Sequence, residues 1–308
     1  MKVYVDRFGA LHDHGVLTLR EVLEFRGGRV SPLEGAESVT AALAGRASNG
    51  WIYPPMSSQW KFDPRSKQPR ERIEGTERPA LLWELNPTHE LTLDRCRGRG
   101  DGRREDAGFI LYLLGYLYGT RLQFEGWAVD GRIPFRSTHN ISVTPQTTAD
   151  FLGNCYDTWR GWQETQQMKA TNLLYMHGRA ICYEWDWERF AVEYMVTDAC
   201  WNLASSLHPD LKSPRHECRI VALCTKFGVP DNACLIERIV DLRNDLFHEA
   251  LWAREEPSMQ VNADAFKLAG DLRRLNQRII PALLGYPTPY VRTRWWELGT
   301  FAFAAVKS

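Results

Sequence analysis

The chain has 308 residues, which is long for one compact helical domain and suits two domains. Hydrophobic residues make up 44% and charged residues 25% of the sequence, which excludes a chain that is disordered or coiled-coil throughout. Lys plus Arg and Asp plus Glu number 38 each, so the overall charge provides no general attraction to nucleic acid or anionic lipid. Any contact with RNA therefore requires a local basic patch.

Targeting, redox and metal signals are weak. No apolar run is long enough for a secretory signal or for the ~20 residues of a membrane span, which predicts a cytoplasmic protein without a membrane partner. The seven cysteines form no C-x-x-C pair and lie in mostly apolar segments, which predicts reduced, buried thiols. The nearest approach to a metal cluster is His216-Glu217-Cys218 with Cys224, whose spacing matches no common zinc pattern. Neither a metal nor a cofactor is predicted.

The first 145 residues predict a β-containing module. Short apolar runs separated by Gly, Pro and Asn predict strands at 3–5, 15–19, 81–85 and 90–93. The polar segment 57–79 predicts a long exposed loop. The segment 95–104 carries five arginines and predicts a solvated, flexible connector, with phosphate contact as the alternative.

An apolar segment closes this module. Residues 106–124 predict a buried helix in which Gly115 and Gly119 allow close packing. Two further strands are predicted at 127–129 and 141–143. The Asp130-Gly131 pair predicts a hairpin between them.

The remainder, residues 146–308, predicts an all-helical bundle. Gly and Pro interrupt its amphipathic segments, as expected at helix ends. The predicted helices span 147–170, 187–208, 214–227, 231–251, 260–284 and 290–304. The predicted fold class is therefore α+β, with a β-rich module at 1–145 followed by an up-and-down helical domain at 146–308.

The helix predicted at 231–251 carries the clearest chemical signal. Asp231 or Asn232 provides a cap, and apolar residues then fill about half of the helix circumference. Arg243 falls within that apolar stripe, where its permanent charge needs a carboxylate, a backbone carbonyl or a ligand phosphate. Asn244 and His248 lie one turn apart near the edge of the stripe. A phosphodiester site is one interpretation; the other is a core ion pair for Arg243 and an ordinary exposed histidine at a helix end.

The helix predicted at 187–208 is apolar almost all round. Its polar residues Asp198, Asn202 and Ser205 recur at spacings of four and three, which places them on one narrow strip. We expect Asp198 and Asn202 to face Arg243 and to support the site. The alternative is that this strip is the solvent side of the helix.

The segment 241–248, with Arg243, Asn244 and His248, resembles the R-N-x-x-x-H motif of the HEPN superfamily. The motif lies near the end of a helix in a small up-and-down bundle, and the match covers roughly residues 150–304. The segment 113–120 after a β-rich region is similar to Apea-like bacterial HEPN proteins linked to phage defence. The resemblance implies a homodimer with the two motif helices facing each other. It also implies antiviral defence by abortive infection, with an N-terminal module that senses a trigger or restrains the enzyme.

The resemblance further implies a metal-independent endoribonuclease acting on RNA such as tRNA. His248 would act as general acid or base, Arg243 would hold the scissile phosphate, and Asn244 would orient the site. The products would carry 2′,3′-cyclic phosphate and 5′-hydroxyl ends. The alternative is a non-catalytic HEPN module that binds RNA or a protein partner through the same surface, which the neutral net charge favours. Motifs for nucleotide hydrolysis, dehydrogenation, zinc proteolysis and serine hydrolysis do not occur in the sequence.

Overall fold

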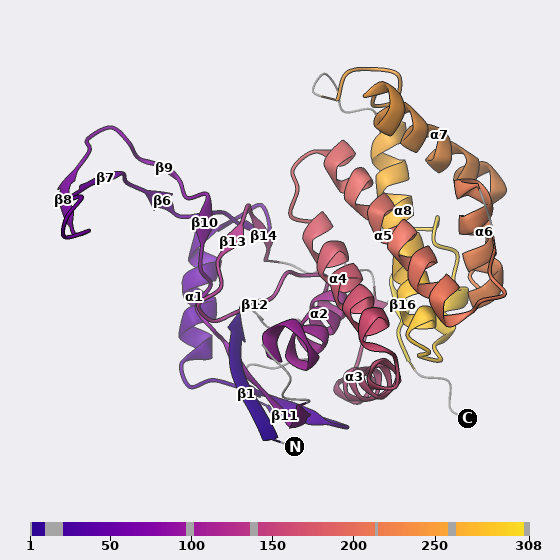
Figure 1. The fold of residues 1–308 in the computed structure, drawn as a ribbon, viewed down its shortest axis with the longest axis horizontal. Coiled ribbons are helices and arrows are strands. Elements are labelled where there is room, and N and C mark those ends of the chain that lie inside the picture. The colour runs from indigo at the N-terminus through magenta and orange to yellow at the C-terminus, as the bar shows by residue number, and fades with distance from the viewer. Residues whose placement is uncertain are drawn as a thin grey trace.

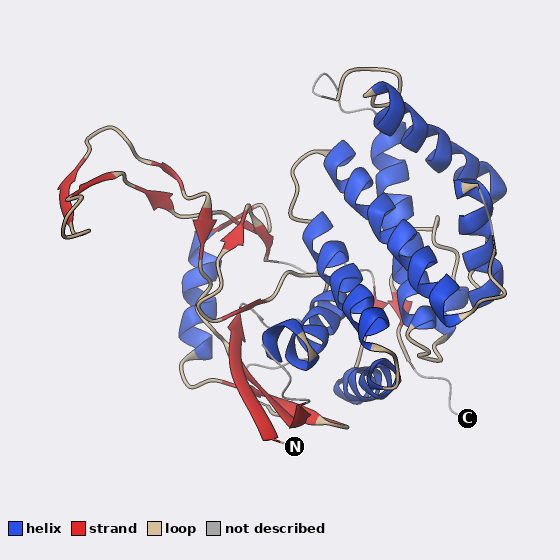
Figure 2. Cartoon of the chain, viewed as in Figure 1, coloured by secondary structure: helices blue, strands red, loops and turns tan. Residues whose placement is uncertain are grey.

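The computed structural model describes residues 2–9, 21–96, 102–135, 141–212, 215–257 and 263–304. These residues form eight α-helices and several small, mostly antiparallel sheets (Figures 1 and 2). The predicted mixture of helices and strands is confirmed, with most strands before residue 143 and six of the helices after it. The strand predicted at 15–19 lies outside the described residues.

The largest sheet has five antiparallel strands in the order β12-β1-β11-β3-β2. Their bounds are β1 (Lys2–Gly9), β2 (Leu23–Phe25), β3 (Gly28–Pro32), β11 (His89–Cys96) and β12 (Gln123–Phe124). In the central strand β11, Leu91 and Leu93 are fully buried, because alternate residues of a strand point to the same face. The strands predicted at 3–5 and 90–93 are therefore confirmed.

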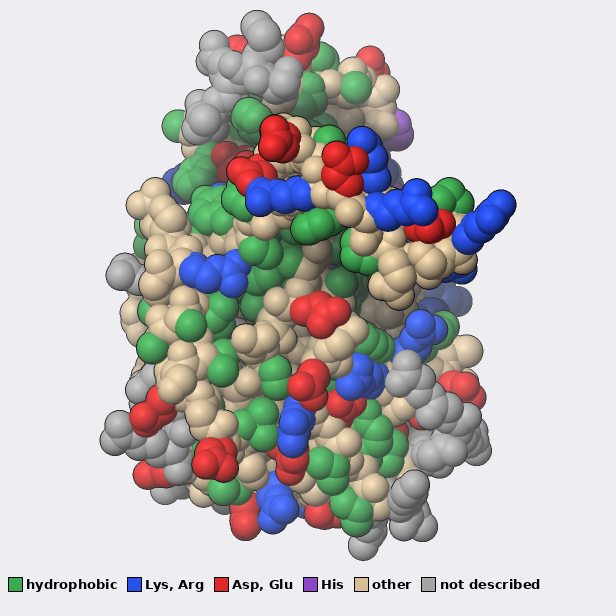
Figure 3. Space-filling model, turned by 90° about the vertical axis from the view of Figure 1, so that its left-hand side faces the viewer, with side chains coloured by type: hydrophobic (Ala, Val, Ile, Leu, Met, Phe, Trp, Pro, Cys, Tyr) green, Lys and Arg blue, Asp and Glu red, His purple; other side chains and the backbone are tan. Residues whose placement is uncertain are grey.

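A long arm projects from the β-rich half (Figure 1). It follows α1 (Ala36–Arg46) and the pair β4 (Ala47–Ser48) and β5 (Trp51–Ile52). Its two ladders pair β6 (Met56–Ser57) with β9 (Arg78–Pro79) and β7 (Trp60–Phe62) with β8 (Pro69–Arg72). The loop predicted at 57–79 is thus exposed but strand-containing, since Trp60 and Phe62 favour extended pairing. Viewed from the arm side, Lys and Arg side chains project along it, and apolar side chains line a hollow beneath it (Figure 3).

The helix α2 (Asp106–Tyr118) confirms the buried helix that its apolar sequence predicts. Every residue except Tyr112 is buried, and the chain leaves the helix through Gly119, whose φ of 60° suits a residue without a Cβ. The hairpin predicted at Asp130-Gly131 is wrong. Instead, β13 (Val129–Asp130) pairs with β10 (Leu82–Trp83), and β14 (Ile133–Pro134) pairs with β5.

Six helices form the second half of the chain: α3 (Pro145–Arg160), α4 (Glu164–Ala180), α5 (Asp186–Leu207), α6 (His216–Phe227), α7 (Ala233–Glu249) and α8 (Ala263–Leu283). The helix predicted at 147–170 is two helices, because the chain turns at Gly161 and a capping box at Gln163 and Gln166 starts α4. Helix α5 packs against α4 and α8, and α6 and α7 pack beside them (Figure 1).

The helix predicted at 290–304 is wrong. The chain forms only a short 3₁₀ turn, η2 (Pro289–Arg292), and then the strand β16 (Phe301–Ala302), which pairs in parallel with β15 (Ile141–Ser142). The extended path inserts Phe303 into the core, where its ring lies 5.1 Å from that of Phe151 and 5.5 Å from that of Tyr286. Tertiary packing therefore overrides the local helical pattern.

One main apolar cluster includes residues on both sides of the predicted boundary at residue 145, among them Leu91, Leu113, Leu203 and Leu272. A smaller cluster lies under α1 and the short strands of the β-rich half. Within the described ranges, no helix combines the length and apolarity required to cross a bilayer. All seven cysteines are free, but the prediction of burial is wrong for Cys218 and Cys234, which are exposed on the outer faces of α6 and α7.

Candidate functional site

The helix α7 begins with the predicted cap. The side chain of Asn232 accepts a hydrogen bond from the backbone nitrogen of Leu235 at 3.2 Å. Toward the N-terminus the apolar stripe is buried at Ile236, Ile239 and Leu242, whereas Phe247 in the last turns is 46% exposed. The apolar stripe therefore meets the core first and reaches the surface near the end of the helix.

Arg243, Asn244 and His248 come together at that end of α7. One guanidinium nitrogen of Arg243, Nη1, lies 3.0 Å from Asn244 Oδ1 and 2.8 Å from His248 Nε2. A guanidinium N–H can only donate, so His248 Nε2 accepts in this contact. Asn244 and His248 are exposed and Arg243 is half-buried, which leaves the group accessible from solvent.

Aromatic rings surround the guanidinium of Arg243. It lies 5.8 Å from the ring centroid of Tyr194 on α5 and 5.4 Å from that of Phe247. No carboxylate of the described chain pairs with Arg243, and its buried Nε has no hydrogen-bond partner there. The core ion pair considered from the sequence is therefore wrong, and Arg243 keeps its charge available for an anion.

The two predicted supporting residues do not contact Arg243 in the described structure. Asp198 Oδ1 instead lies 3.4 Å from His216 Nδ1 and 3.8 Å from Arg219 Nη1, both on α6. Asn202 is exposed, which agrees with the solvent-side alternative for this part of α5. The expectation that Asp198 and Asn202 face Arg243 is corrected accordingly, because α6 packs against this strip and supplies the partners for Asp198.

Asp198 and Arg243 nonetheless both affect the pKa values of Tyr194 and His216. Burial raises the pKa of the Tyr194 phenol, Asp198 adds to that rise, and Arg243 opposes it. Burial lowers the pKa of His216, Asp198 opposes this shift, and Arg243 and Arg219 add to it. His216 is thus a second imidazole beside the site that holds its neutral form to lower pH. In the sequence, His216 stands out only as part of the His216-Glu217-Cys218 cluster, which matches no common metal pattern.

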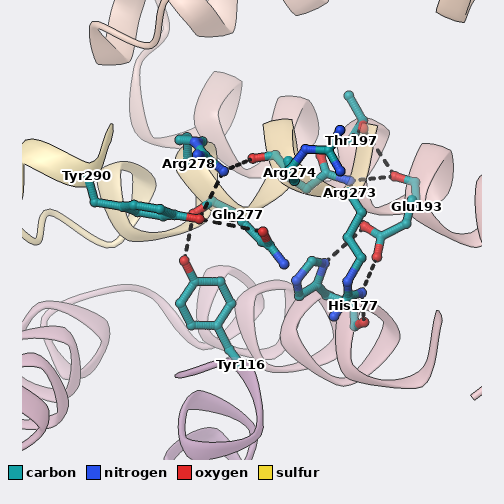
Figure 4. Close-up of polar contacts among 10 residues, drawn as sticks. Tyr116, His177, Glu193, Thr197, Arg273, Arg274, Gln277, Arg278 and Tyr290 are labelled. Carbon is teal, nitrogen blue, oxygen red and sulfur yellow. Dashed lines mark hydrogen bonds and ion pairs between the residues drawn. The ribbon is translucent and has the colours of Figure 1, made fainter. Parts of the chain in front are cut away.

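A second polar cluster lies in the interior and has no sequence motif (Figure 4). Glu193 of α5 accepts from His177 of α4 at 2.9 Å and from Arg273 of α8 at 2.5 Å. Burial alone would raise the pKa of Glu193, but His177 and Arg273 lower it, so the carboxylate stays charged. Asn276 and Thr197 complete the network through bonds of 2.8 to 3.1 Å. The sequence signal is a glutamate that lies among apolar residues of α5, between Val192 and Tyr194.

Comparison of this chain with protein-family models, with curated proteins and with solved structures found no match.

Proposed function

We propose that the protein is a metal-independent endoribonuclease of the HEPN type that uses Arg243 and His248, with Asn244 positioning Arg243. The observation that carries the proposal is the accessible contact between His248 and an arginine that lacks a carboxylate partner in the described structure. A half-buried guanidinium without a carboxylate partner favours binding of a phosphate. The phosphate oxygens accept hydrogen bonds from the planar set of N–H donors of the guanidinium. The resemblance of 241–248 to the R-N-x-x-x-H motif supports the same assignment.

The proposed reaction follows from the two side chains. When the phosphate takes over Arg243 Nη1, His248 Nε2 is released and takes the proton of a ribose 2′-hydroxyl, and the resulting 2′-oxygen attacks the adjacent phosphorus. Arg243 stabilises the negative charge that develops on the phosphorane-like transition state. The bond to the 5′-oxygen breaks as that oxygen receives a proton, which leaves a 2′,3′-cyclic phosphate and a 5′-hydroxyl end. A histidine suits both transfers, because its ordinary pKa lies near neutral pH.

A homodimer fits this chemistry. The exposed Phe247 lies beside Arg243 on the apolar stripe of α7, so pairing of two α7 helices would bury it. The arrangement would also bring His248 of the partner subunit toward Arg243. One imidazole would then act as base and the other as acid. The resemblance places such an enzyme in antiviral defence by abortive infection.

The test is to incubate the purified protein with tRNA and total RNA in excess EDTA and to map the product ends. Cleavage that leaves 2′,3′-cyclic phosphate and 5′-hydroxyl ends is expected. Products with 5′-phosphate ends, or a requirement for a divalent metal, would refute the proposed chemistry. RNA binding without cleavage, lost in Arg243→Ala, would instead favour the non-catalytic binding module.

A further inference from the structure

A cavity lies away from the α7 motif, between the β-rich half and the helices. It encloses about 470 Å³, within the ~300 to 1,000 Å³ that small-molecule sites occupy. Its walls come from β5 at Trp51, from the end of α4, from the N-terminal half of α5, from α8 and from the C-terminal segment. The α7 motif contributes no residue to it. Helix α5 connects the two regions, since Glu193 lines the cavity and Tyr194 contacts Arg243.

Positive charge exceeds negative charge around this cavity. Its lining includes five cationic residues and two carboxylates: Arg189, Lys267, Arg273, Arg274 and Arg278, with Asp186 and Glu193. Both carboxylates are already engaged, Asp186 with Arg189 at 3.3 Å and Glu193 with Arg273 at 2.5 Å. Arg274 pairs with Asp271. The remaining cations, Arg278 and Lys267, have no ion-pair partner in the described chain.

Arg278 is the decisive residue, because it is only 1% exposed. Neutral groups receive its hydrogen bonds: the Tyr290 hydroxyl at 3.0 Å, the Arg274 carbonyl at 3.1 Å and the Thr293 hydroxyl at 3.1 Å (Figure 4 shows the first two). A buried charge without a counter-ion is unfavourable, so an anion bound in the cavity would stabilise it. Lys267 is exposed on α8 at the rim, three helical turns or about 16 Å from Arg278, where it adds positive charge at the mouth of the cavity.

Aromatic side chains form much of the remaining wall. Trp51, Phe266, Tyr290, Trp296 and Phe301 all line the cavity, and Phe266 is 54% exposed at its rim. The Arg278 guanidinium already lies 4.4 Å from the Tyr290 ring centroid and 5.1 Å from that of Phe301. A ligand that fits these walls has a planar, largely apolar body as well as a negative group.

We propose that this cavity is a second ligand site that binds a nucleoside phosphate. The uncompensated charge of Arg278 would attract the phosphate, Lys267 would add positive charge at the rim, and the base would stack on the aromatic wall. This ligand class combines an anion with a planar ring, and a mononucleotide suits the size of the cavity. The inference does not depend on ribonuclease activity.

Titration calorimetry of the full chain with adenosine 5′-monophosphate tests the proposal. Adenosine and inorganic phosphate each lack one half of the ligand, so each is expected to bind at least about tenfold more weakly, a difference of ~1.4 kcal/mol. A 5′-phosphorylated oligonucleotide distinguishes the source: tighter binding than the mononucleotide assigns the site to an RNA end, and weaker binding assigns it to a free nucleotide. Decanoate carries a negative group but no nucleobase, so it tests whether the ligand needs an aromatic ring. Binding of decanoate without binding of the nucleotide would overturn the proposal.

Rim variants locate the binding site without disturbing the buried Arg278. Lys267→Glu and Phe266→Ala are each expected to weaken nucleotide binding at least about tenfold. Lys169→Glu, an exposed cation on α4, and Phe62→Ala, an exposed aromatic on the arm, are the matched controls and should bind as the unmodified chain does. The proposal fails if no nucleoside monophosphate binds at millimolar concentration, or if both rim variants bind as tightly as the controls.

Discussion

Among single residues, Arg243 contributes to the proposed site through the shape of its side chain as well as its charge. Its guanidinium contacts Asn244 and His248 through Nη1, and two aromatic rings flank it. A lysine would keep the charge but lose the planar fork of donors and the fit between the rings. Charge alone therefore does not replace it.

Arg243→Lys is expected to slow RNA cleavage by about a hundredfold, because removing one well-placed donor from a transition-state oxyanion costs about that much. Single-turnover cleavage at saturating enzyme measures the effect. The matched control is Arg238→Lys on the same helix, whose partner Asp264 is largely exposed and which should cleave normally. Equal rates for the two variants would contradict the role given to Arg243.

A buried histidine of the β-rich half contributes to the response to acid. His89 is almost fully buried in β11, stacks on Phe8 with ring centroids 5.8 Å apart, and bonds through Nδ1 to the Thr88 hydroxyl. Burial lowers the pKa of His89 to about 4, whereas an unfolded chain takes up this proton near pH ~6.5. The stability that a neutral His89 contributes is thus fully present above pH ~6.5 and is lost as the pH falls toward 4.

His89→Phe is therefore expected to flatten the loss of unfolding free energy between pH ~6.5 and 4, by up to about 1.4 kcal/mol per pH unit. Urea unfolding at several pH values measures this slope. His177, whose pKa burial also lowers, is present in both proteins, so their difference isolates His89. Parallel curves for the two proteins would show that His89 is protonated in the folded state.

At the scale of elements, the end of α7 fixes where His248 lies. The helix ends at Ala250, which adopts a left-handed conformation with φ 55° and donates its N–H to the Asp245 carbonyl. This conformation disfavours a side chain with a Cβ and suits glycine. The local strain lies two residues from His248.

Ala250→Gly is expected to raise the free energy of unfolding by up to about 1 kcal/mol. The substitution relieves the left-handed strain of the folded chain, and the greater freedom of glycine in the unfolded chain offsets part of that gain. The control Ala42→Gly, an exposed interior position of α1, should lower it by about 1 kcal/mol. Thermal and denaturant unfolding measure both. A loss of stability in both variants would contradict the conformation assigned to Ala250.

Local signals predicted some elements well and failed where tertiary contacts decide. A cap at Asp231 or Asn232 and the apolar stripe predicted α7 from the sequence, and the apolar run of α2 predicted a buried position. The last segment differs, because the contacts of Phe303 with Phe151 and Tyr286 are long-range and leave no periodic signal. The same applies to Asp198, whose partners on α6 depend on helix packing that no spacing within α5 encodes.

At the scale of the whole molecule, the β-rich half and the helical half share an apolar core. Tyr116 of α2 donates to the Gln277 carbonyl of α8 at 2.6 Å, and Asp130 beside the arm pairs with Arg121 at 2.9 Å and with Arg179 of α4. A signal received by the β-rich half would therefore reach the helices through direct contacts. The sensing or restraining role of residues 1–145 stays a prediction.

The proposed homodimer places Phe247 at its centre. Phe247→Glu is expected to convert the protein to a monomer and to abolish cleavage, because a charge would replace the apolar contact between the two α7 helices. Analytical ultracentrifugation over a range of protein concentrations measures the assembly. Phe62→Glu, on the exposed arm, is the control that should stay dimeric; a monomeric unmodified chain would refute this interface.

In the proposed mechanism His248 transfers protons during RNA cleavage, so a variant without its imidazole should lose activity. In excess EDTA, the rate of tRNA cleavage by His248→Ala is expected to fall about a hundred to ten thousand fold, with the dimer intact. Glu249→Ala, the exposed neighbour in the last turn of α7, should cleave like the unmodified chain. Cleavage by His248→Ala at the unmodified rate would contradict the account.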